Sequence, residues 1–147
     1  MRTPHLPVHS CTSGKSKPPQ PYLVQTKHQP RVDLVGEEGE AMYTLMAVDP
    51  DAPSPEDRKW SEYLHYLVTN IVGGTVSTGT VVADYVPADP PEGTHRYIWL
   101  LYKQPTLDSL TAKDPTHGRR QNFSAKNFAS HHNLGAPVGA TYFTASA

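Results

Sequence analysis

The stretch Ala41-Met42-Tyr43-Thr44-Leu45-Met46-Ala47-Val48-Asp49-Pro50-Asp51-Ala52-Pro53-Ser54-Pro55 decides the fold, because it joins an apolar strand to a stiff, acidic turn. Apolar and aromatic side chains fall on both faces of residues 41–49, which is typical of a strand in the middle of a sheet. Proline has no N–H to donate, so Pro50 ends the strand and the prolines that follow exclude a helix. Asp49 and Asp51 therefore stand in a rigid turn.

Other strand patterns follow this stretch along the chain. Residues 62–71 and 95–104 predict two long strands, and residues 80–85 and 141–144 predict two shorter ones. A single helix is predicted from an N-cap at Ser124 to a stop at Asn133 and Gly135. With 15 prolines and 10 glycines in 147 residues, the chain favours short strands and loops over a helical bundle. We therefore expect a mainly β, antiparallel fold.

The composition changes near residue 30. Residues 1–30 contain six prolines and no aspartate or glutamate, which predicts a Pro-rich, mobile segment before a domain spanning residues 31–147. The same composition is compatible with an organelle transit peptide. The formal net charge of −1 gives no overall field for direct nucleic-acid binding. A single cysteine, Cys11, excludes an internal disulfide, so we expect a cytoplasmic protein, with nuclear or organellar locations as alternatives.

Titratable side chains lie at the end or on one face of three predicted strands. Asp49 and Asp51 follow the first, His65 lies within the second, and His95 and Tyr97 share one face of the third behind Pro90-Pro91. Each has a structural explanation, such as a turn that caps backbone N–H groups or a buried, bonded histidine. Together they leave three interpretations open: a metal site, an acid–base site, or an anion pocket.

The order and spacing of these segments resemble the phosphatidylethanolamine-binding protein family, which includes Raf-kinase inhibitor proteins and plant flowering-time regulators. The matching motifs are Asp-Pro-Asp-Ala-Pro-Ser at residues 49–54 and Gly-x-His-Arg-Tyr at residues 93–97. The resemblance implies an antiparallel two-sheet β fold with few peripheral helices. It also implies a pocket for phosphate-like anions or phosphoethanolamine head groups, lined by Asp49, Asp51, Pro53, His65, Pro91, His95 and Tyr97.

The resemblance carries further expectations. It implies a cis bond between Ala52 and Pro53, and strand alternation predicts that Arg96 faces away from the pocket and supports the turn from behind. The family's early strands are expected to be missing or replaced here, which shortens the domain at its N-terminus. The residues near Arg119 and Arg120 look closer to the plant-like branch.

The function implied is that of a non-enzymatic regulator without metal or cofactor. Its expected partners are an anionic ligand and a protein, either a kinase or a transcription-complex component. Peripheral contact with a membrane is a further expectation. The alternative is an inhibitor of serine carboxypeptidases, and a metal-dependent or acid–base enzyme is a weaker one.

Overall fold

A computed structural model describes residues 29, 30, 32, 34 and 40–147. Its strands are β1 (Met42–Asp49), β2 (Tyr63–Val72), β3 (Thr80–Ala83), β4 (Thr94–Lys103) and β5 (Gly139–Ser146), with a short 3-10 helix, η1 (Val76–Thr78), and a helix, α2 (Ala125–His131). The predicted mobile segment, residues 1–30, lies almost wholly outside the described residues, so it stays a prediction.

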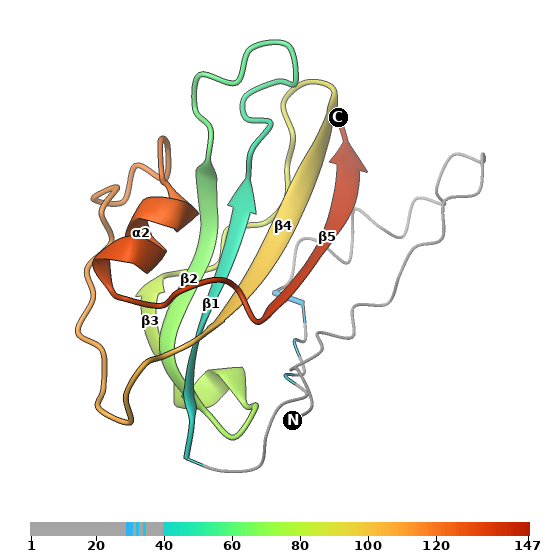
Figure 1. The fold of residues 1–147 in the computed structure, drawn as a ribbon. Helices are drawn as coiled ribbons and strands as arrows, with labels where there is room; N and C mark the ends of the chain where they lie inside the picture. The colour runs from blue at the N-terminus through green and yellow to red at the C-terminus, as the bar shows by residue number, and fades with distance from the viewer. Residues whose placement is uncertain (1–28, 31, 33, 35–39) are drawn as a thin grey trace.

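The five strands form one sheet in the order β3-β2-β1-β4-β5, and every neighbouring pair is antiparallel (Figure 1). The mainly antiparallel β fold is thus confirmed, and β1 is central as its two apolar faces predicted. The expected second sheet is not seen in the part of the chain that the structure describes. β5 is longer than predicted because it pairs with β4 continuously, from Leu101 opposite Gly139 to Thr94 opposite Ser146.

The two faces of the sheet bury separate clusters. On the first, which we call the helix face, Phe123 and Phe128 pack against Met46, Leu64 and other buried side chains, and α2 covers the sheet there (Figure 1). The second, which we call the pocket face, carries a largely aromatic and aliphatic cluster: Tyr43, Leu45, Ala47, Tyr66, Val68, Ile71, Trp99 and Leu101. Val32 and Leu34 pack against this second cluster.

The helix begins as the sequence predicted. The Ser124 hydroxyl accepts a hydrogen bond from the backbone N–H of Asn127 at 3.1 Å. A carboxylate that the prediction missed, Glu62, accepts the N–H of Ala125 at 2.7 Å. These two acceptors satisfy N–H groups that the first turn of a helix leaves free. None of the helices in the described residues is long and apolar enough to cross a membrane.

A buried polar network joins β1, β2 and the end of β4. The side-chain oxygen of Gln104 accepts hydrogen bonds from the Thr44 hydroxyl at 2.9 Å and from the Asn70 backbone N–H at 2.8 Å. Its amide nitrogen donates to the side-chain oxygen of Asn70 at 3.0 Å. Asn70 in turn accepts the N–H of Leu110 at 2.7 Å. The network therefore pins the loop after β4 to the sheet.

Replacing Gln104 by leucine is expected to lower the free energy of unfolding by about 2 kcal/mol, because a buried hydroxyl and a buried N–H lose their acceptor. Chemical denaturation of the two proteins measures the change. Gln121→Leu, at a half-buried glutamine outside this network, is the control and should cost less. Equal losses for the two variants would contradict the role given to the network.

Candidate functional site

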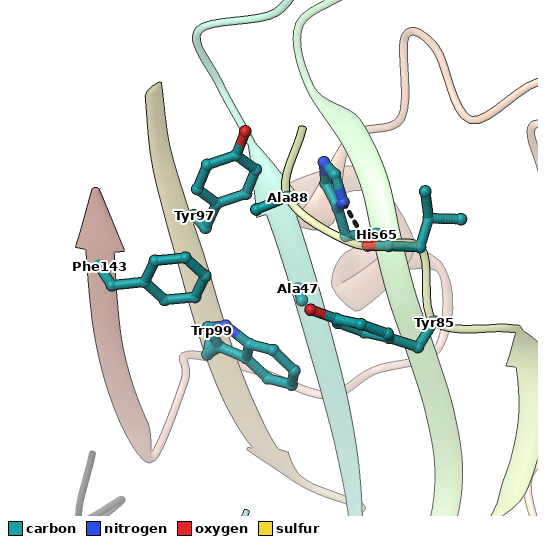
Figure 2. Close-up of a pocket in the computed structure, with 8 residues that line it drawn as sticks. Ala47, His65, Tyr85, Ala88, Tyr97, Trp99 and Phe143 are labelled. Atoms are coloured by element: carbon teal, nitrogen blue, oxygen red, sulfur yellow. Dashed lines mark hydrogen bonds between the residues drawn. The ribbon is translucent and has the colours of Figure 1, made fainter. Parts of the chain in front are cut away.

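A small pocket opens on the pocket face, where β1, β2, β4 and β5 meet the segment after β3 (Figure 2). It holds about 180 Å³ of empty space, part of it open solvent. Most of the lining is aromatic or aliphatic, and four of the side chains also carry a polar atom: His65, Tyr85, Tyr97 and Trp99. The lining residues are Ala47, His65, Tyr85, Val86, Ala88, Tyr97, Trp99 and Phe143.

His65, on β2, is held by the segment after β3. Its Nδ1 donates a hydrogen bond to the Val86 carbonyl at 2.7 Å, and the Val86 N–H donates to the His65 carbonyl at 2.8 Å. Burial lowers the pKa of the ring, although the Val86 carbonyl and the Asp49 carboxylate act in the opposite direction. The imidazole is therefore neutral near pH 7. Among the residues that the structure describes, none is hydrogen-bonded to its Nε2.

Tyr97, on β4, stands between His65 and β5. Its ring meets the His65 ring edge-on at a centroid distance of 5.1 Å and stacks on Phe143 at 5.2 Å. Burial raises the pKa of the Tyr97 hydroxyl far above its ordinary value, with a further rise from the Asp49 charge. The hydroxyl thus keeps its proton and can donate. Figure 2 shows this hydroxyl and the unbonded ring nitrogen of His65 at the same end of the pocket.

His95 is fully buried, and its ring stacks beside that of Tyr97 at a centroid distance of 6.3 Å. Its Nδ1 lies 2.6 Å from a carboxylate oxygen of Asp49, and its Nε2 lies 2.8 Å from the Glu92 carbonyl. A carbonyl oxygen only accepts, so Nε2 carries a hydrogen, and Nδ1 is hydrogen-bonded to Asp49. Both ring nitrogens are occupied. His95 and Asp49 are therefore not among the residues that line this pocket, and they support it instead.

Asp51 is hydrogen-bonded to Arg96 of β4. Its carboxylate accepts hydrogen bonds from the Arg96 backbone N–H, Nε and terminal nitrogen, each at 2.9 Å. The Nε of Arg58 lies 3.3 Å away. The expectation that Arg96 supports the turn from behind agrees with these contacts. Asp51 itself, expected in the pocket lining, is a buried partner of two arginines.

The turn between Asp49 and Asp51 is one in which an aspartate caps a backbone N–H, the structural explanation that the sequence left open. One oxygen of Asp49 accepts the Asp51 N–H at 2.8 Å, as an aspartate does when it caps a turn. The Ala52–Pro53 bond is cis, as predicted. Pro53 is half-buried and Pro91 exposed, and neither lines the pocket described above. A direct binding role for Pro53 and Pro91 stays a prediction.

Sequence reasoning did not single out the apolar wall. Trp99 could have been found, because strand alternation puts it on the same face of β4 as Tyr97. Phe143 enters through the pairing of β4 with β5, where it stands opposite Tyr97. Tyr85 and Ala88 come from a segment without regular structure, so no periodicity points to them. In the described ranges, no three His, Cys, Asp or Glu side chains gather as metal ligands.

Comparisons with known proteins agree on one family. The sequence pattern described as phosphatidylethanolamine-binding protein matches residues 5–143. A carboxypeptidase Y inhibitor, solved with its cognate proteinase, is 25% identical with a TM-score of 0.72, over 84% of this chain and 73% of that one. CG7054, solved in solution, is 42% identical with a TM-score of 0.66, over the same shares. A phosphatidylethanolamine-binding protein from Plasmodium vivax shares the fold at 21% identity, with a TM-score of 0.66, over 84% and 74%.

Proposed function

Because the chain belongs to the phosphatidylethanolamine-binding protein family, we propose that it is a non-catalytic protein that binds phosphate-like anions or phosphoethanolamine head groups in this pocket. One observation carries the proposal: the Tyr97 hydroxyl and the unbonded ring nitrogen of His65 lie at the same end of the pocket (Figure 2). A phosphate group between them would meet these two polar groups beside a largely aromatic wall. Pockets of this composition use a few polar groups to orient a ligand.

The surroundings of the pocket support binding without chemistry. Among the described residues that line it, none is serine, cysteine or lysine, the usual nucleophiles. The histidine–aspartate pair formed by His95 and Asp49 could exchange protons, but His95 is fully buried and both its ring nitrogens are bonded. A bound molecule would therefore meet a donor and an acceptor rather than a catalytic pair.

The test is a titration of the whole chain with phosphoethanolamine, in which calorimetry or NMR measures the binding. The double variant His65→Ala, Tyr97→Phe is expected to bind about 100-fold more weakly, since it loses two hydrogen bonds to a charged group. Tyr142→Phe is the matched control, because Tyr142 is 63% exposed and lies outside the pocket lining. Equal affinity of the double variant and the wild type would refute the proposal.

For the protein partner, we propose that the ligand-bound protein regulates a kinase or a transcription-complex component. The family membership supports this class of partner and does not name one. Inhibition of a serine carboxypeptidase is the second candidate, favoured by the likeness to the carboxypeptidase Y inhibitor. Assaying carboxypeptidase Y with increasing amounts of the chain separates the two, since only an inhibitor lowers its activity.

A further inference from the structure

The backbone around His65 fixes where its first proton sits. The Val86 carbonyl, 2.7 Å from Nδ1, can only accept, so Nδ1 carries a hydrogen in both the neutral and the charged ring. The neutral ring therefore presents a lone pair on Nε2. The ring can donate at Nε2 only after it takes up a second proton. The hydrogen bond to Val86 thus makes the pocket's histidine an acceptor whenever it is neutral.

The groups that face His65 keep it neutral at physiological pH. Asp49, on β1, favours the charged ring, whereas Arg120 and His95 disfavour it, and burial outweighs all of them. The rings of Tyr63 and Tyr97 contact the imidazole without adding charge of their own. The side chain is only 7% exposed, so water compensates little for a buried cation.

Where they lie at the same end of the pocket (Figure 2), Tyr97 therefore offers a donor, its hydroxyl, and His65 offers an acceptor, its Nε2. Building on the proposed function, we propose that, as long as His65 is neutral, the site selects a phosphate that carries its own P–OH group, a monoester or inorganic phosphate in its singly charged form, over a phosphodiester. An anionic oxygen of the ligand would accept from Tyr97, and its P–OH would donate to His65. A diester, the form of phosphate in an intact phospholipid, has only acceptor oxygens. Its oxygen and Nε2 are then two acceptors that cannot form a hydrogen bond with each other.

Two ligands that differ by one methyl group test this: methyl phosphate, a monoester, and dimethyl phosphate, a diester. At pH 6, close to the second pKa of a phosphate monoester, we expect the monoester to bind the whole chain about tenfold more tightly, the loss for one unmade hydrogen bond to a charged group. This difference in affinity should narrow as the pH falls through the lowered pKa of His65, because the protonated ring can donate to either ligand. Above pH 6, affinity for the monoester should fall, because the ligand loses the P–OH proton that it donates to His65.

Two variants separate the roles of the polar groups. His65→Asn keeps an N–H that can donate to Val86 and removes the acceptor at Nε2, so it should bind both ligands alike at every pH. Tyr97→Phe should weaken both ligands by the same factor and leave their ratio unchanged. Phosphoethanolamine and its glycerol diester provide a second pair, in which the ammonium group is common to both.

Two results would overturn the inference. Equal binding of the monoester and the diester by the wild-type chain at pH 6 would refute the selection while leaving anion binding intact. No binding of either ligand between pH 5 and 8 would refute the proposed function, and the inference with it. The wild-type comparison decides the matter even if a variant fails to fold.

Discussion

Replacing Asp49 by alanine is expected to lower the free energy of unfolding by about 3–5 kcal/mol, because two buried groups, the His95 imidazole and the Asp51 N–H, lose their hydrogen-bond partner. The carboxylate of Asp49 is the partner of His95 Nδ1 at 2.6 Å, and both side chains are almost completely buried. Without this carboxylate, Nδ1 of the buried His95 imidazole would have no hydrogen-bond partner. The variant also loses the hydrogen bond from the Asp51 N–H.

Chemical denaturation near pH 7 measures this loss, with Asp89→Ala as the control. Asp89 is exposed and is hydrogen-bonded to no other side chain in the described part of the chain, so its removal should change stability by less than about 0.5 kcal/mol. If the two alanine variants unfold at the same denaturant concentration, the pair between Asp49 and His95 does not stabilise the fold.

Alternation along the strands predicted much of the fold and part of the site. Residues 42–49 are apolar on both faces, and β1 lies in the centre of the sheet as that pattern requires. The same rule put His95, Tyr97 and Trp99 on one face of β4. It cannot say which of them is free to bind, because the Glu92 carbonyl and the Asp49 carboxylate that occupy His95 come from other segments.

The buried polar residues that the sequence did not predict lie in loops and near strand ends. Gln104 at the end of β4 and Asn70 near the end of β2 look like surface residues in the sequence, yet both are buried and bond each other. Asn70 also has a φ of 60°, a left-handed conformation that asparagine tolerates better than most residues. Only the pairing of the strands brings these two side chains together, and periodicity within one strand carries no information about it.

Asp51→Ala is expected to lower the free energy of unfolding by about 3 kcal/mol at pH 7, because the Arg96 N–H and guanidinium lose a shared, charged acceptor. The side chain of Asp51 is 3% exposed and that of Arg96 is 46% exposed, so the arginine left behind can turn to water. The loss should therefore be smaller than for Asp49, whose partner stays buried. Denaturant unfolding of both alanine variants tests this order.

The pH dependence of the same variant tests the cause. The Arg96 hydrogen bond holds the pKa of the Asp51 carboxyl below its ordinary value, against the effect of burial. A lowered pKa stabilises the folded protein above the unfolded-state value, about 3.9, and that stability is lost as the pH falls through the folded value. The difference between wild type and Asp51→Ala should thus be full at pH 7 and shrink below about pH 4.

Asp57→Ala is the matched control for this ion pair. Asp57 lies 3.2 Å from Lys59, but their side chains are 59% and 61% exposed, so solvent screens the pair and its removal should cost less than about 1 kcal/mol. A difference of that size for Asp51→Ala, unchanged between pH 7 and pH 3, would mean that the buried pair with Arg96 is no stronger than a surface contact. If the loss of stability is large at pH 7 and disappears in acid, Asp51 stabilises the turn through its bonds with Arg96.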